Sequence, residues 1–363
     1  MHQPIAFRAA RVLLTGAAVA WLASCHSVGP TTIPRDRFDY STAIGDSWKR
    51  QTLLNIVRLR YADPPIFVDV GQVVAGYSLE TVVSAGGVMS SAGAVQGDSA
   101  SLGAQGRFTD RPTITYTPLT GNRFIENIAT PISPRAIFET IEHGFPAHAM
   151  LQMGVASING LRNVDSDLDG GRPADPRFLE VAQLLRDAQR RGAVGTRTRV
   201  DAAGDRAVVI TLRNPRATDE DRAAGLRVRE LLGLDPEATE FELVGGEFSM
   251  HPRQIAVRGR SLLRVLQVLA LYVEVPERDV AEGRATRGLE VPGAGAQPGG
   301  FRVMSSDNEP EDAFVAVRYR NRYYYVSDRD LSSKRLLSFI MILFSLADRS
   351  EEAAKPVLTI PTQ

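Results

Sequence analysis

The chain has 363 residues, of which 44% are hydrophobic and 23% are charged. This balance is typical of a water-soluble body with one large or two compact domains, and it is too polar for a protein made of many membrane spans. Because 42 basic residues offset 42 acidic ones, no overall charge attracts polyanions such as nucleic acid. The single cysteine, Cys25, excludes internal disulfides and cysteine-based zinc clusters.

The N-terminus carries the most specific pattern. Residues 1–11 contain two arginines, and residues 12–23 form an uncharged, mostly apolar stretch that ends just before Cys25. Such a stretch is too short to span a bilayer core of ~30 Å, which needs about 20 apolar residues. The pattern therefore predicts a cleavable export signal over residues 1–24.

Residues 22–25, Leu-Ala-Ser-Cys, match the lipobox of bacterial lipoproteins, and over this segment the chain resembles that class. The resemblance implies cleavage after Ser24 and acylation of Cys25, which would anchor the protein with about 0.8 kcal/mol per buried methylene. His26 occupies the position at which Asp signals inner-membrane retention, so the resemblance implies a lipid anchor in the outer membrane, facing the periplasm. The bilayer is thus an expected partner, with residues 25–37 as a short tether.

The rest of the chain alternates between helical and strand patterns. In chain order we predict a helix over 40–61, strands over 66–74 and 113–116, helices over 137–144 and 178–191, strands over 196–200 and 207–212, a helix over 220–232, strands over 240–244 and 254–257, and a helix over 261–273. After a loop over 282–300 we predict strands over 314–319 and 323–327 and a buried helix containing 336–346. The expected fold class is α+β: antiparallel hairpins alternate with amphipathic helices in an N-terminal module, 38–160, and a C-terminal module, 175–350, followed by a tail, 351–363.

The segment 84–106 is mostly Gly, Ala and Ser and contains no Lys or Arg. Residues from Leu79 to Met89, and again from Ala100 to Phe108, alternate between a mostly apolar and a mostly polar face. Two interpretations stay open. The segment is either a small-residue surface hairpin, or a membrane-spanning hairpin of which several copies enclose a pore, since strands of about 9 to 11 residues cross a bilayer. Curli-type secretion channels, which are lipoproteins, resemble the second arrangement in architecture.

Few residues offer catalytic chemistry. Residues 45–47, Gly-Asp-Ser, resemble the start of the serine block of lipase-like hydrolases, but Ser47 lies in a helical pattern. None of His143, His148 and His251 has Asp three residues before it, as the base of that family does. Because a serine hydroxyl without a base is a weak nucleophile, we expect no enzyme activity and no cofactor, with a hydrolase as the weakest alternative.

An acidic loop offers a candidate calcium site. Asp165, Asp167 and Asp169 alternate ahead of Gly170, like the first half of a calcium-binding loop. The twelfth position, which should be a bidentate Glu, is Pro176. We therefore expect a solvated acidic loop and no metal, with weak calcium binding as the alternative.

A hairpin near the C-terminus interleaves cationic and aromatic residues. The candidates for a partner surface are Arg318, Tyr319, Arg320, Arg322, Tyr323 and Tyr325. Arg and Tyr are frequent in protein interfaces, and Arg also binds anionic groups. The alternative is a charged strand edge with half-buried tyrosines. Nucleic acid is not an expected partner, because the predicted signal exports the chain.

These patterns together resemble uncharacterised proteobacterial envelope lipoproteins with a Trp-bearing N-terminal helix and a Tyr-rich hairpin before an apolar C-terminal helix. We therefore predict a membrane-anchored, non-enzymatic binding or assembly subunit, whose partner is an envelope protein or further copies of the chain. The alternative is an oligomeric pore or secretion-channel subunit that uses the hairpin 79–108.

Overall fold

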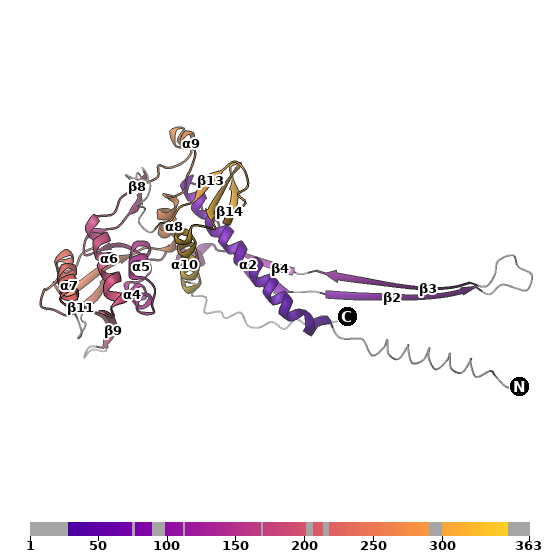
Figure 1. The fold of residues 1–363 in the computed structure, drawn as a ribbon, viewed down its shortest axis with the longest axis horizontal. Helices are drawn as coiled ribbons and strands as arrows, with labels where there is room; N and C mark the ends of the chain where they lie inside the picture. The colour runs from indigo at the N-terminus through magenta and orange to yellow at the C-terminus, as the bar shows by residue number, and fades with distance from the viewer. Residues whose placement is uncertain are drawn as a thin grey trace, which may run out of the picture. The chain divides into compact units, whose positions relative to one another are not determined.

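A computed structural model describes residues 28–74, 77–88, 99–111, 113–167, 170–200, 206–212, 218–289 and 300–347. The predicted export signal, Cys25, Asp169 and the tail 351–363 lie outside these ranges. The fold is α+β, as predicted, with several small sheets and helices between them (Figure 1). The chain divides into two compact units, one made of Met1–Gly45 and Val68–Thr117 and the other of Asp46–Phe67 and Pro118–Gln363.

This division corrects the predicted modules 38–160 and 175–350. Strand β5 (Val155–Ile158) pairs antiparallel with β12 (Gln254–Gly259), so residues assigned to the first module lie inside a sheet of the second. The prediction was wrong because helix and strand patterns mark single elements, whereas the pairing of distant strands leaves no local pattern.

Helix α2 (Val28–Arg60) covers all but the last residue of the predicted helix 40–61 and starts earlier, so the predicted tether is helical from Val28 onward. Pro30 is tolerated because it lies in the first turn, where a backbone N–H has no helical acceptor. The C-terminal part of α2 buries Leu53, Ile56 and Val57 completely, which places that end of the helix in the core of the second unit.

The first unit contains the predicted small-residue hairpin. Strand β1 (Val68–Val74) pairs with β4 (Thr113–Pro118), and β2 (Tyr77–Val88) pairs with β3 (Ser99–Asp110), which run side by side in Figure 1. The register places Leu79 opposite Phe108 and Val83 opposite Ala104. Because directly paired residues share a face of an antiparallel ribbon, the two apolar faces predicted separately belong to one face of the hairpin.

The second unit contains a six-stranded sheet with the order β6-β5-β12-β11-β10-β9. Its other strands are β6 (Leu161–Arg162), β9 (Val194–Val200), β10 (Arg206–Leu212) and β11 (Glu240–Gly245). The predicted hairpin of β9 and β10 is confirmed, but β11 and β12 are parallel rather than antiparallel. The chain between them, 246–253, returns to the start of β11 before β12 begins.

Four helices pack with this sheet, and their ends follow from local sequence. They are α4 (Pro134–Glu142), α5 (Ala147–Gly154), α6 (Pro176–Arg190) and α7 (Asp219–Leu232). Ser133 and Asp175 accept backbone N–H groups at the starts of α4 and α6, each followed by a proline that suits the first helical position. Phe178, Val181 and Phe241 lie in the buried core between the helices and the sheet.

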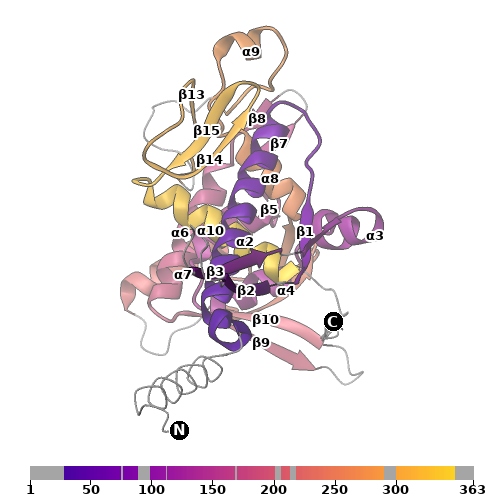
Figure 2. The ribbon, with the colours of Figure 1, turned by 90° about the vertical axis from the view of Figure 1, so that its right-hand side faces the viewer.

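A second core in the same unit surrounds the C-terminal end of α2. It involves α8 (Leu262–Ala270), α9 (Glu277–Ala281), α10 (Leu331–Ala347) and a sheet of β13 (Met304–Ser306), β15 (Arg322–Ser327) and β14 (Ala313–Tyr319). Leu337 and Ile340 are fully buried, so α10 is the core helix that the sequence predicts. The three-stranded sheet and α9 lie at the same end of this unit (Figure 2).

The remaining short elements link these parts. They are α3 (Gly121–Phe124), the π-helical turn η1 (Ile125–Ala129), β7 (Asp165–Asp167) and β8 (Gly170–Arg172). Of the predicted loop 282–300, residues 290–299 lie outside the described ranges. No helix in the described part of the chain has both the length and the apolar character needed to cross a membrane.

Candidate functional site: an arginine-lined cleft

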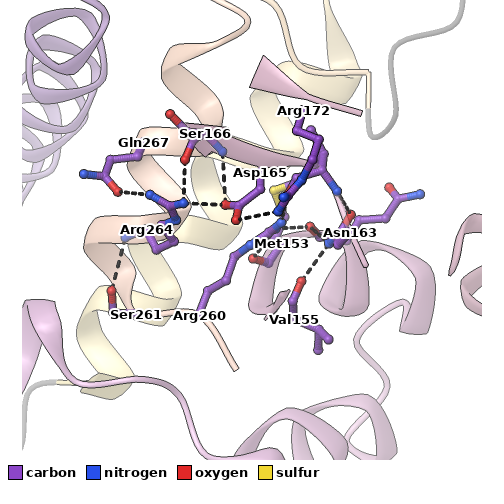
Figure 3. Close-up of polar contacts among 12 residues, drawn as sticks. Met153, Val155, Asn163, Asp165, Ser166, Arg172, Arg260, Ser261, Arg264 and Gln267 are labelled. Carbon is purple, nitrogen blue, oxygen red and sulfur yellow. Dashed lines mark hydrogen bonds and ion pairs between the residues drawn. The ribbon is translucent and has the colours of Figure 1, made fainter. Parts of the chain in front are cut away.

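The acidic loop predicted as a possible calcium site is built into an ion-pair network (Figure 3). Arg264 Nη2 lies 2.9 Å from Asp165 Oδ1, and Arg172 Nη2 lies 3.4 Å from Asp165 Oδ2. Asp167 is in strand β7, and Asp169 lies outside the described residues. A calcium ion at Asp165 would have to displace two guanidinium groups. Among the described residues, no group of three or more His, Cys, Asp or Glu is placed to hold a metal.

Arg260 is the buried centre of this region and is only 1% exposed. Its Nη1 donates to the backbone oxygens of Gln152 (2.6 Å) and Met153 (3.2 Å), and its Nη2 donates to that of Val164. Burial lowers the pKa of Arg260 to about 10, so the side chain keeps its proton at neutral pH. Because its partners are backbone carbonyls of the α5–β5–β7 corner, we assign Arg260 a structural role (Figure 3).

The predicted Arg–Tyr surface is divided between two faces of the β13-β15-β14 sheet. The register pairs Tyr323 with Arg318 and Tyr325 with Ala316, whereas Arg322 pairs with Tyr319. Since paired residues share a face, Arg318, Tyr323 and Tyr325 belong to one face, while Tyr319 and Arg322 belong to the other. On the first face, the Arg318 guanidinium lies 6.0 Å from the centre of the Tyr323 ring.

Tyr319 of the second face and Arg320 of the adjoining turn contact residues near the end of α2. The Tyr319 hydroxyl donates to Asp63 Oδ2, and Arg320 Nη2 lies 3.2 Å from the same oxygen. The Arg320 guanidinium also lies 4.6 Å from the centre of the Tyr61 ring. Tyr319 and Arg320 therefore hold the hairpin against the end of α2, and Arg320 remains exposed.

A buried hydroxyl cluster continues this contact towards α9. The Tyr61 hydroxyl donates to Asp279 Oδ2 at 2.8 Å and lies 2.6 Å from the Tyr324 hydroxyl. Burial, followed by these hydrogen bonds, raises the pKa of Tyr61 well above its usual value. The cluster connects α2, α9 and β15 through groups that are all buried.

Beside this cluster lies an open cleft of about 880 Å³. Three arginines line it: Arg60 from the end of α2, Arg287 from the segment after α9, and Arg322 from β15. Arg322 is the only residue of the predicted Arg–Tyr surface that lines this cleft.

Arg60 is buried, with only 5% of its surface exposed. Its guanidinium nevertheless has few hydrogen-bond partners among the described residues. Its backbone oxygen accepts bonds from Thr286 N (2.9 Å) and Thr286 Oγ1 (3.0 Å). Among the described residues, its guanidinium makes one hydrogen bond, a long one of 3.5 Å from Nη1 to Thr286 Oγ1, and its buried Nε has no partner. No described carboxylate forms an ion pair with it. Burial lowers the pKa of Arg60 to about 10, which still leaves it charged at neutral pH.

The backbone at Gly288 lies directly against Arg60. A Cβ atom at this position would lie 2.8 Å from Arg60 Nη2 and 3.0 Å from the backbone oxygen of Leu271. A side chain at this position would therefore have to displace the Arg60 guanidinium and shift the backbone at Leu271 slightly, whereas glycine allows the close approach.

The other charged groups of the cleft balance one another, so the net positive charge of the cleft is that of Arg60. Arg322 Nη1 lies 2.5 Å from Asp307 Oδ1, but its buried Nε has no partner. Arg287 is exposed and forms no ion pair with a described residue. Of the two acidic residues, Glu274 is paired with Arg302, which leaves Glu277 as the remaining carboxylate. The arrangement can bind an oxyanion between guanidinium groups.

The other predicted residues do not converge on this cleft. Ser47 is exposed on α2, and no described histidine hydrogen-bonds to it. His143 caps the end of α4, whereas His148 lies in α5, where burial lowers its pKa. Cys25 lies outside the described residues.

Sequence reasoning missed Arg60 because a cation in the last turn of a helix is common and favourable. No known protein family, curated protein or solved structure matches the chain, so the assignment of this site depends on its geometry.

Proposed function

We propose that the protein is an envelope lipoprotein, held at the periplasmic face of the outer membrane by acylated Cys25. Its body is a non-enzymatic binding subunit, and its binding site is the arginine-lined cleft, which takes an anionic ligand. The observation that carries the second part is the buried guanidinium of Arg60, which lacks a carboxylate partner among the described residues.

A buried charge is costly in a folded protein unless it is paired and hydrogen-bonded. The negative end of the α2 dipole offsets part of this cost, by about 0.3–1 kcal/mol, because Arg60 is the last residue of the helix. A ligand oxyanion would offset the rest, since charge-assisted bonds to Arg are among the strongest hydrogen bonds in proteins. The described lining residues include no histidine or cysteine, which favours binding over catalysis.

Thermal unfolding tests the binding site. Phosphate, sulfate and acetate are compared with chloride at constant ionic strength, in wild type, in Arg60→Met and in Arg329→Gln, whose side chain is 87% exposed. We expect at least one oxyanion to raise the Tm of wild type and of Arg329→Gln equally, and to leave Arg60→Met unchanged. An equal rise in all three proteins would contradict a site at Arg60.

Metabolic labelling tests the anchor. Labelled palmitate should enter the wild-type protein and not Cys25→Ala, and only the wild type should sediment with membranes. A Cys25→Ala protein that stays membrane-bound would remove this part of the proposal, while the cleft would be unaffected.

A second candidate function is an oligomeric pore or secretion-channel subunit that uses residues 79–108. It is favoured by the register of β2 and β3, which brings the two mostly apolar faces onto one side of the ribbon. A two-stranded ribbon alone is only marginally stable in water, so further strands from other copies would stabilise it. Mild detergent extraction followed by mass measurement tests this candidate, since a monomer of the lipidated chain would contradict it.

A further inference from the structure

We propose that the ligand of the cleft is an anionic amphiphile: a molecule with a phosphate or carboxylate group joined to an aliphatic chain. This inference rests on the proposed function, because it names the class of ligand that the arginine-lined cleft takes. It follows from the apolar wall that faces the same space as the arginines.

The apolar wall comes from the segments that follow α8 and surround α9. Val275, Val280 and Leu289 are half-buried and pack against the core, while Leu271 and Val273 behind them are buried. The wall therefore stands on well-packed side chains and still exposes part of its aliphatic surface to the cleft. An aliphatic chain placed there would remove apolar surface from water on both partners.

The volume of the cleft agrees with a ligand larger than an inorganic ion. At about 880 Å³ it is within the range of pockets that bind small organic molecules. A water molecule occupies roughly 30 Å³ of liquid, so an oxyanion of a few water volumes would leave most of the cleft unfilled. An anion bound at Arg60 thus leaves room for an attached chain along the apolar wall.

The wall is also held in place. Asp279 of α9 accepts the buried hydrogen bond from Tyr61, and Thr286 is fixed to the backbone of Arg60 by two hydrogen bonds. These contacts attach both sides of the apolar wall to the end of α2, which carries the cation. Charge and apolar surface therefore keep a fixed spacing, as recognition of an amphiphile requires.

A chain-length series tests the inference. Ethyl, butyl and octyl phosphate, with octyl glucoside as the neutral comparison, are each titrated below the micelle concentration into the purified Cys25→Ala protein. We expect affinity to rise about two- to fourfold per methylene over part of the series, in line with the burial of apolar surface. Val280→Ser should flatten this dependence and keep ethyl phosphate binding, while Met250→Ser, at a site 92% exposed, should change neither.

The outcomes separate the two proposals. Equal affinities for ethyl and octyl phosphate would overturn the amphiphile and leave the anion site standing. Octyl glucoside binding as tightly as octyl phosphate would overturn the role of the charge. If no phosphate binds at any length, the anion site and the amphiphile both fail.

The source of the ligand is tested in a second arm with vesicles. Vesicles of anionic phospholipid are mixed with the same Cys25→Ala protein and with its Arg60→Met derivative. Flotation that depends on Arg60 would support a lipid headgroup as the anion, whereas octyl phosphate binding without flotation would support a soluble amphiphile. Flotation of both proteins to the same extent would contradict recognition of the lipid through the cleft.

Discussion

Two buried arginines in the second unit have similar burial and a similar charge but different surroundings. Arg260 is 1% exposed and Arg60 is 5% exposed, and burial lowers the pKa of each to about 10. Arg260 donates to three backbone oxygens, whereas the guanidinium of Arg60 makes one long hydrogen bond among the described residues. The difference indicates that burial alone does not define the role of an arginine. Its hydrogen-bond partners distinguish Arg260, which supports the fold, from Arg60, which we propose binds a ligand.

The largest expected effect is at Arg260. Arg260→Met leaves the backbone oxygens of Gln152, Met153 and Val164 without their donor, and we expect it to lower the free energy of unfolding by about 2–4 kcal/mol. Urea unfolding measures the change, with Arg329→Gln as an exposed control. A loss of stability below about 0.5 kcal/mol would mean that the hydrogen bonds of Arg260 do not support the fold. The two buried arginines would then not differ in the way that we infer from their partners.

A smaller effect is expected at the hydroxyl cluster behind the cleft. Tyr61→Phe removes the donor to the buried carboxylate of Asp279, and we expect a loss of about 2 kcal/mol, since bonds to charged groups are worth about 1.5–3 kcal/mol. The same variant should weaken octyl phosphate binding, because α9 loses its attachment to α2. Unchanged ligand affinity would mean that this attachment does not organise the cleft.

The smallest effect is expected at the ion-pair network. The Asp165 side chain is 16% exposed, but its partners Arg264 and Arg172 are 38% and 48% exposed, so solvent screens both pairs. We expect Asp165→Asn to cost about 1 kcal/mol or less in urea unfolding. Calcium should not change the Tm of either the wild type or the variant. A calcium-dependent rise of the Tm in the wild type alone would restore the calcium alternative.

Local patterns in the sequence predict the separate elements well. The helices predicted over 137–144 and 178–191 are found as Pro134–Glu142 and Pro176–Arg190, each beginning two or three residues earlier at a cap followed by proline. The alternation around Val83 and Ala104 likewise anticipates the face that the hairpin register creates. Such features depend on neighbouring residues, which is why they can be read from one sequence.

Contacts between distant segments cannot be read in this way. The pairing of β5 with β12 joins residues far apart in the chain and overturns the predicted module boundary. The candidate site behaves similarly: the composition of the β14–β15 hairpin singles out Arg322, but the other arginines of the cleft come from a helix end and a loop. No local pattern brings Arg60, Arg287 and Arg322 together.

Arg60→Met, unfolded in urea with and without octyl phosphate, tests the central claim most directly. Without ligand we expect the variant to be more stable than wild type by about 1 kcal/mol, since an apolar side chain replaces a poorly paired buried charge. With saturating ligand we expect the order to reverse, because only wild type gains stability from binding. A variant that is less stable than wild type without ligand, and equally stabilised by it, would contradict the claim that Arg60 is kept charged and buried for an anionic ligand.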